Sequence, residues 1–311
     1  AVSCRLLPFR MRNNRLVEME VESDIAKWYH GKAVFITGAT GFMGKVLVEK
    51  LLRSCPDIGP IYILIREKKQ ILPQDRIDEM MSSSAFDEVR SSRPDRKDWL
   101  VPISGEIILP DLGISAEDRH LLQEKVSVVF HLAATIKFDE PLKIAVAMNT
   151  DGTRVLLELC RGMTSLCAIV HVSTAYTNCI FPVIEERVYS YLHVDMIAGF
   201  ETIFRLIGDH PNTYTFSKAL AENVVEEYST ELPIVIVRPS IVTAAWREPM
   251  PGWVDSFGGA TSILAAAGKG LFKSLYGKRQ FVIDLIPVDT CINLFIAAAW
   301  EIGMFKVNGL H

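Results

Sequence analysis

The chain has 311 residues, of which 49% are hydrophobic, which is enough to bury the core of one large α/β domain. Its net charge of −4 at pH 7 and its pI near 6.0 give no reason to expect a nucleic-acid partner. The six cysteines form no CxxC pair and no metal-ligand spacing, so we expect reduced thiols in an intracellular protein and no metal site.

The first 23 residues are interpreted as a leader outside the folded domain. The chain begins with Ala1, and its first fifteen residues hold arginines at positions 5, 10, 12 and 15 and no acidic residue. A weak targeting peptide has this composition, but a disordered leader or a gene-model extension fits it better. We therefore expect the domain to begin near residue 24.

The most informative stretch runs from Lys32 to Leu52. Its first part, Lys32 to Thr37, is an apolar run typical of a buried parallel strand. Gly38, Gly41 and Gly44 follow at three-residue spacing, and an amphipathic helix comes next. Such a strand, glycine turn and helix open a dinucleotide-binding βαβ unit, in which the helix N-terminus faces the pyrophosphate. An ordinary glycine turn is the alternative, and the flanking strand and helix argue against it.

The second expected strand, Ile61 to Ile65, ends in the cation Arg66, with Lys68 and Lys69 just beyond. An acidic residue at this strand end would bind the ribose 2′-hydroxyl of NAD, whereas a cation suits the 2′-phosphate of NADP. The alternative is a solvated basic loop. We predict NADPH as the cofactor.

Further apolar runs predict the rest of a doubly wound parallel sheet. They lie at Val101 to Ser104, Val126 to Phe130, Ala168 to Val172 and Ile234 to Val237. Residues 70–100 are polar and are expected to form helix and loop, and a helix is expected from about Pro141 to Arg161. Small residues after the strand at 126–130 would let a cofactor pass close to the backbone. His131, beside them, fits a core histidine, and we assign it no chemistry.

Two stretches suit substrate binding. Residues 180–212 form an insertion rich in aromatic side chains, although core packing explains each of these side chains equally well. From residue 244 onward the chain is rich in Gly, Pro and small residues, with a helix and then a strand near Phe281 to Leu285.

The run Cys291 to Trp300 is apolar but only ten residues long, so we expect a core helix and no membrane span.

A second motif predicts the catalytic side chains. Tyr214 and Lys218 are four residues apart, so on a helix they lie on one face. A phenol ionises near pH 10, and an ammonium one turn away is expected to lower that pKa toward the range useful for proton transfer. The same lysine would hydrogen-bond the nicotinamide ribose. A solvated Tyr–Lys pair is the alternative. Thr174, or else Ser173, would hold the substrate oxygen.

These motifs belong to a longer resemblance. From about residue 24 to its end the chain resembles the animal fatty acyl-CoA reductases of the male-sterility type, a branch of the extended short-chain dehydrogenase/reductases. The matching segments, in family order, are WYHGKAVFITGATGFMGKVLVEKLLRSCP, IYILIR, VFHLAATIKFDEPL, NTDGTRVLLELC, HVSTAY, NTYTFSKALAE, PIVIVRPSIV, EPMPGWVDSF and VIDLIPVD. The resemblance implies a Rossmann-like α/β fold and NADPH-dependent reduction of long-chain acyl-CoA to fatty alcohol through an aldehyde, with release of CoA, in lipid metabolism such as wax and ether lipid synthesis.

The resemblance also implies roles for single residues. Tyr214, Lys218 and Thr174 match the catalytic positions of the family. The cofactor-contacting positions are matched by Gly38, Thr40, Gly41, Phe42, Met43, Gly44, Arg66, Ala133, Ala134, Thr135 and Lys218, with Pro239 and Ser240 over the nicotinamide side. Glu106 lies at the adenine edge, where the family usually has Asp.

The family usually continues into a C-terminal helical domain and, in many members, a membrane-anchoring helix, whereas this chain stops at His311. We therefore expect one reductase domain over 24–311, with substrate binding mainly in 180–212 and 244–311, and without that C-terminal domain. The resemblance implies an intracellular protein at the peroxisomal or endoplasmic reticulum membrane, with any membrane association made through the missing region.

Two other functions stay open. One is an extended short-chain dehydrogenase acting on another carbonyl compound, such as a sugar nucleotide or a steroid. The run EPMPGWVDSF after the Tyr–Lys motif argues against it. The other is a truncated chain that binds NADPH without turnover, as an interaction or regulatory protein. The presence of Thr174, Tyr214 and Lys218 together argues against this second function.

Overall fold

The centre of the computed structural model is a six-stranded parallel sheet in the order β5-β4-β3-β6-β7-β8. Its strands are β3 (Ala33–Thr37), β4 (Ile61–Ile65), β5 (Leu100–Ser104), β6 (Val126–His131), β7 (Ala168–Val172) and β8 (Ile234–Val237). The strand order reverses between β3 and β6, which is the switch point of a doubly wound sheet. The predicted fold class and all six predicted sheet strands are confirmed, with ends that shift by at most one residue.

The structure describes residues 10–12, 15–17, 23–67, 71–93, 99–190, 207–255, 258–271, 273–274, 276–278, 280 and 282–307. The remaining α-helices and strands are α1 (Asp24–Trp28), α2 (Phe42–Ser54), α3 (Pro73–Ser82), α4 (Asp87–Ser92), α5 (Ala116–Lys125), α6 (Leu142–Val146), α7 (Gly152–Arg161), α9 (Thr213–Tyr228), α10 (Gly259–Gly268), α11 (Val288–Val307), β1 (Arg10–Arg12), β2 (Arg15–Val17), β9 (Ile241–Thr243) and β10 (Leu285–Pro287).

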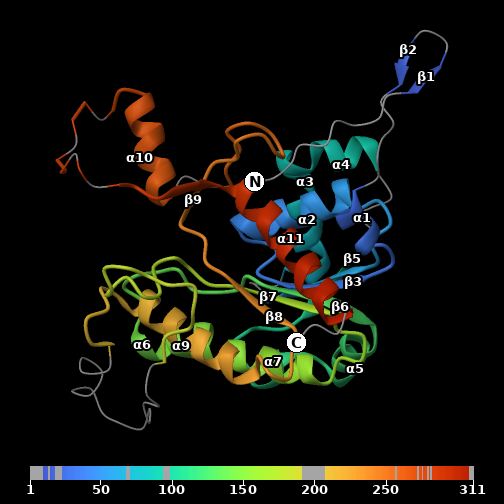
Figure 1. Cartoon of the computed structure of the whole chain (residues 1–311), viewed down its shortest axis with the longest axis horizontal. Coiled ribbons are helices and arrows are strands. Elements are labelled where there is room, and N and C mark those ends of the chain that lie inside the picture. The colour runs from blue at the N-terminus through green and yellow to red at the C-terminus, as the bar shows by residue number, and fades with distance from the viewer. Residues whose placement is uncertain are drawn as a thin grey trace.

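Helices cover both faces of the sheet (Figure 1). Side chains alternate between the two faces along β3, so that Val34 and Ile36 pack into one core and Ala33 and Phe35 into the other. The first core is closed by α2 and α11, and the second by α7 and α9. Both faces are therefore apolar along the whole strand, which is why the strands appear in the sequence as continuous apolar runs.

The C-terminal helix α11 contains the apolar run that the sequence indicated. Among the described helices it is the one that is long and apolar enough to cross a membrane, over Val288–Phe305. It packs on the sheet instead: Phe295 is fully buried, and the Tyr29 hydroxyl donates a hydrogen bond to the Ile296 carbonyl at 3.1 Å. A buried helix of this composition is a core helix, as expected.

Three regions differ from the expectation. The helix expected over 141–161 is interrupted by a π-helical turn, Ala147–Asp151, between α6 and α7. The last strand, β10, begins at Leu285 and pairs in parallel with β9, which the sequence did not predict. Within the expected leader, β1 and β2 form an antiparallel pair away from the sheet (Figure 1). Residues 191–206 of the expected substrate-binding insertion lie outside the described residues.

Candidate active site

The turn between β3 and α2 forms the floor of a cleft at the carboxyl edge of the sheet. Gly38 has a φ of +77°, and a Cβ atom on it would lie 2.7 Å from the Ala133 nitrogen. A Cβ atom on Gly44 would lie 2.3 Å from the Gly38 carbonyl oxygen. Both positions therefore require glycine, the first for its backbone conformation and the second for close packing of helix on strand. Gly41 is the N-cap of α2 and makes no side-chain cap.

The cleft has a volume of about 390 Å³ and collects most of the predicted cofactor residues. Ten of them line it: Gly38, Thr40, Gly41, Phe42, Met43, Gly44, Arg66, Glu106, Ala133 and Ala134. Thr135, Lys218, Pro239 and Ser240 are not among the residues that line this cleft. They lie farther along the same edge, after β6, in α9 and after β8.

Two arginines meet at the far end of the cleft. Arg66 pairs with Glu106, with 3.1 Å between Nη1 and Oε1. Arg76, from α3, donates through Nη1 to the Arg66 carbonyl at 2.7 Å and through Nη2 to Thr40 Oγ1 at 3.3 Å. Two guanidinium groups therefore line the cleft at the end of β4, where a dinucleotide carries the 2′ position of its adenosine ribose.

The sequence did not single out Arg76. It lies in the polar stretch 70–100, and only the return of α3 toward the cleft brings it beside Arg66. Lys68 and Lys69, which follow Arg66 in the sequence, lie outside the described residues.

The Tyr–Lys motif lies on the first turns of α9. Asn212 caps this helix, because its side-chain oxygen accepts a hydrogen bond from the Thr215 nitrogen at 2.9 Å. The Thr174 side chain lies close enough to the Tyr214 hydroxyl to act on its pKa. Lys218 is buried and its Nζ donates to the carbonyl of Val172, the last residue of β7, at 2.8 Å. The predicted catalytic groups are thus brought together at the end of β7.

Burial dominates the electrostatics of this pair. It raises the pKa of Tyr214 above the ordinary 10.0, against the opposing effect of the hydrogen bond with Thr174. The expectation that Lys218 lowers this pKa was wrong for the structure, in which the ammonium is directed at the Val172 carbonyl. Burial also lowers the pKa of Lys218 to about 8, opposed by the negative charge of Glu222. The phenol therefore keeps its proton at neutral pH.

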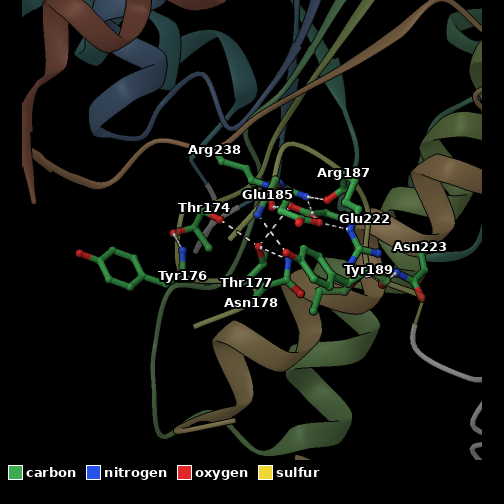
Figure 2. Close-up of polar contacts among 12 residues, drawn as sticks. Thr174, Tyr176, Thr177, Asn178, Glu185, Arg187, Tyr189, Glu222, Asn223 and Arg238 are labelled. Atoms are coloured by element: carbon green, nitrogen blue, oxygen red, sulfur yellow. Dashed lines mark hydrogen bonds and ion pairs between the residues drawn. The ribbon is translucent and has the colours of Figure 1, made fainter. Parts of the chain in front are cut away.

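The two hydroxyl candidates have different surroundings. Ser173 donates a hydrogen bond through Oγ to Glu222 Oε1 at 2.6 Å, on the buried side of the loop. Thr174 accepts a hydrogen bond from the Tyr176 nitrogen at 3.3 Å (Figure 2), and its side chain acts on the pKa of Tyr214. Thr174 is thus the hydroxyl beside the phenol, and Ser173 is engaged elsewhere.

A buried asparagine on the helix expected from the sequence, to which the sequence assigned no role, connects the two halves of the site. Asn149, in the π-helical turn, accepts a hydrogen bond from the Thr135 nitrogen at 2.9 Å. Its amide donates to the Thr135 carbonyl at 3.1 Å and to Ser217 Oγ at 2.9 Å. The loop after β6 is therefore held to α9 beside Lys218. A π-helical break has no residue pattern of its own, so it could not be predicted from the sequence.

Two further predicted residues lie at the same edge. The Pro239 carbonyl accepts a hydrogen bond from the Ala175 nitrogen at 2.9 Å, which places the loop after β8, with Ser240, beside the loop after β7.

His131 lies between Thr37 and Thr153, at 2.7 and 3.0 Å, and burial lowers its pKa to about 3. It is a neutral core histidine. Among the described residues no cluster of His, Cys, Asp and Glu is arranged to hold a metal ion.

Residues 36–295 match the male sterility protein family. The chain belongs to this family. It is 46% identical over 297 residues to fatty acyl-CoA reductase 1 of Xenopus laevis and 42% identical over 297 residues to fatty acyl-CoA reductase 1 of Homo sapiens. Each alignment covers 92% of this chain and 58% of the relative, so the chain spans a little over half the length of the curated relatives it matches.

Solved structures share the fold. The terminal R domain from the myxalamid PKS-NRPS biosynthetic pathway superposes with a TM-score of 0.64 at 25% identity, over 87% of this chain and 62% of that chain. A UDP-glucuronic acid 4-epimerase from Bacillus cereus in complex with NAD gives a TM-score of 0.54 at 20% identity, over 86% and 73% of the two chains. With the family match, this identifies a Rossmann domain of the class that binds nicotinamide dinucleotides.

Proposed function

We propose that this chain carries the catalytic site of an NADPH-dependent fatty acyl-CoA reductase, which converts a long-chain acyl-CoA to a fatty alcohol through an aldehyde and releases CoA. The observation that carries the proposal is the Tyr214–Thr174 pair, next to Lys218 at the end of β7, in a chain 46% identical to a fatty acyl-CoA reductase. The peroxisomal or endoplasmic reticulum membrane is the location that this relation favours.

The cleft fits NADPH. A Cβ atom on Gly38 or Gly44 would meet backbone atoms at 2.7 and 2.3 Å, so the floor of the cleft is bare backbone, as a pyrophosphate requires. The first N–H groups of α2 supply partial positive charge there. At the far end, Arg66 and Arg76 would hold the 2′-phosphate, since guanidinium groups bind phosphate in two-pronged geometry. When bound, NADPH supplies one hydride for each of the two reductions.

Tyr214 and Thr174 would hold the thioester carbonyl oxygen. As hydride adds to the carbonyl carbon, negative charge develops on that oxygen, and the protonated phenol stabilises it by donating a hydrogen bond. The carbonyl then re-forms, the C–S bond breaks, and CoA leaves as a thiolate that takes a proton from solvent. In the second round the aldehyde oxygen occupies the same place, and Tyr214 gives its proton to the alkoxide. Solvent restores the proton to the phenol.

Lys218 would hold the hydroxyls of the nicotinamide ribose. Its ammonium is fixed by the Val172 carbonyl at 2.8 Å, which leaves two of its three N–H groups to donate. Because its pKa is lowered to about 8, the group is charged at neutral pH and loses its charge within the mildly alkaline range.

Residues 244–255 would form one wall of the substrate site. Trp253 stacks on Phe42, which lines the cleft, with ring centroids 5.8 Å apart. Lys45 pairs with Asp255 at 2.5 Å, so the segment is attached to α2 directly beyond the glycine turn. Together with the described part of 180–212, this segment supports the expected location of substrate binding.

The test is NADPH oxidation by the purified chain with palmitoyl-CoA, with products identified by gas chromatography and a Tyr214→Phe variant as the control. Hexadecanol formed by the unmutated chain and not by the variant supports the proposal. Equal rates for the two proteins, or NADPH binding without thioester turnover, would overturn it for this chain. The second outcome would favour an NADPH-binding protein.

A further inference from the structure

A third side chain shares the face of α9 that carries the catalytic pair. Tyr214, Lys218 and Glu222 follow one another at four-residue steps, so Glu222 lies one turn beyond the lysine. Its side chain is only 1% exposed. No role follows for it from the proposed chemistry, yet a carboxylate buried this deeply needs partners for both of its oxygens.

Glu222 has those partners (Figure 2). Arg238, from the loop after β8, donates through Nε to Oε1 at 2.8 Å and through Nη2 to Oε2 at 2.7 Å, which is a two-pronged pair. Ser173 Oγ donates to Oε1 at 2.6 Å, and Thr177 Oγ1 lies 3.4 Å from the same oxygen. One carboxylate thus joins α9 to the loops that follow β7 and β8.

Arg238 also reaches the chain beyond Thr177. It donates through Nη2 to the Arg187 carbonyl at 2.8 Å and through Nη1 to the Glu185 carbonyl at 3.3 Å. Asn223, next to Glu222 on α9, donates to the Tyr189 carbonyl at 2.7 Å. Residues 185–189 are therefore tied to the catalytic helix through two adjacent side chains (Figure 2). This segment lies in the region where the sequence places substrate binding.

A buried ion pair gives little net stability, because the cost of taking two charges out of water offsets their attraction. Stability alone therefore explains this pair poorly. Its position is more informative: it contacts the residue before Thr174, lies one turn from Lys218, and holds the backbone of 185–189.

We propose that Glu222 and Arg238 are a positioning pair, which sets the charge around Lys218 and holds Thr174 and residues 185–189 in place against α9. The inference rests on the proposed function for its effect on turnover, but not for its effect on Lys218. The pair does not touch the substrate, and its residues act through Lys218 and Thr174.

The titratable groups that face Lys218 come from three elements. Glu222 and Tyr214 lie on α9 with it, His131 lies on β6 and His171 on β7. Burial lowers the pKa of both histidines far below neutrality, and burial keeps the phenol of Tyr214 protonated. Glu222 is therefore the charged group that acts on Lys218 near pH 8, and Arg238 is the group that partly neutralises it.

Substitutions at the two members of the pair should thus have opposite effects. Glu222→Gln keeps the shape and removes the negative charge, so the pKa of Lys218 should fall by about one unit or more. Arg238→Gln leaves the charge of Glu222 without its counter-ion, so the pKa of Lys218 should rise. A merely structural pair would give two variants that lose stability alike and leave that pKa where it was.

The experiment measures the pKa of Lys218 by NMR. The whole chain is labelled with ¹³C-lysine, and the Lys218 Cε signal is followed as a function of pH. The signal is assigned by its loss in Lys218→Met. Glu226→Gln, an exposed charge change one turn further along α9, and Arg154→Gln, which breaks the exposed Arg154–Glu227 pair, are the matched controls. Opposite shifts at Glu222 and Arg238, with no shift in the controls, support the inference. An unmoved pKa in either variant, or shifts in the same direction, would overturn it.

Turnover supplies the second readout and separates the two proposals. With palmitoyl-CoA, the alkaline limb of the kcat profile should move with the pKa of Lys218 in each variant. Arg238→Lys keeps the charge and loses the two-pronged contact, so it should raise KM for the acyl-CoA about tenfold with little change in kcat. It also serves as the milder variant if Arg238→Gln fails to fold. If the unmutated chain reduces no thioester and yet the opposite NMR shifts are seen, the proposed function fails and the positioning pair stands.

Discussion

The proposed nucleotide cleft and the proposed catalytic centre lie at the same edge of the sheet but are made of different parts. The floor of the cleft is backbone: at Gly38 and Gly44 a single added carbon would overlap main-chain atoms. The catalytic centre is made of buried side chains that fix one another, as Lys218 is fixed by Val172 and opposed by Glu222. We therefore expect the cleft to be disrupted by added side-chain volume and the catalytic centre by a change in charge or polarity of its side chains.

The largest effect should come from filling the backbone floor. In Gly44→Ala the new Cβ atom would lie 2.3 Å from the Gly38 oxygen and 2.5 Å from Ala39 Cα, and backbone atoms must move to admit it. We expect a loss of about 3 kcal/mol in the free energy of unfolding, together with loss of NADPH binding. Urea unfolding followed by circular dichroism measures the first, and cofactor fluorescence the second.

Gly41→Ala is the matched control for this prediction. Its Cβ atom would meet the Gly38 oxygen at 3.3 Å, where a small adjustment suffices. Equal destabilisation by the two substitutions would contradict the argument that close approach of the backbone makes this turn.

The catalytic centre should lose rate rather than stability. Tyr214→Phe removes the hydroxyl beside Thr174, and we expect kcat to fall by about 10²- to 10⁴-fold while the Kd for NADPH is unchanged. Stopped-flow turnover and a fluorescence titration test the two halves of this statement. A variant with weakened cofactor binding and unchanged kcat would assign the phenol to the cofactor site instead.

The sequence predicts the cleft better than the catalytic centre, for a physical reason. Buried parallel strands need continuous apolar runs, and a turn that approaches a pyrophosphate needs glycine, so both features are local in the chain. The spacing of Tyr214 and Lys218 is local too. Their pKa directions depend on burial, and burial is fixed by elements distant in the sequence.

The residues that the sequence missed follow the same rule. Arg76 reaches the cleft because α3 folds back over the end of β4, and Asn149 is aimed by a π-helical turn. Glu222 lies in α9 and Arg238 directly follows β8, so the two side chains meet only when α9 and β8 are packed side by side. The short pairing of β9 with β10 involves three residues in each strand, too few to show a pattern.

Substitution at the arginine end of the cleft should have an effect of intermediate size, on the preference for NADPH over NADH. Arg76→Ala removes one of the two guanidinium groups at the proposed 2′-phosphate site, and we expect the Kd for NADPH to rise about 10- to 100-fold with little change for NADH. Isothermal titration with both cofactors measures the ratio. An equal loss for NADPH and NADH would place Arg76 in the fold and not in cofactor selection.

The smallest expected effect near neutral pH is the change of turnover with pH in the unmutated chain. The pKa of Lys218 is lowered from 10.5 to about 8, so the ammonium loses its proton as the pH rises through that value. If turnover needs the charged group, its rate is at its maximum below about pH 7, is half of that maximum near pH 8, and falls about tenfold for each further pH unit. A kcat/KM profile for NADPH between pH 6 and pH 10 tests this, and a profile flat to pH 10 would contradict it.

The central claim is that the cleft delivers hydride to a thioester carbonyl held by Tyr214 and Thr174. The most direct measurement uses palmitoyl-CoA with NADPH that carries deuterium at both C4 positions, and reads the product by mass spectrometry. We expect hexadecanol with two deuterium atoms on C1, one from each reduction. Unlabelled product, or consumption of palmitoyl-CoA without any reduced product, would contradict it.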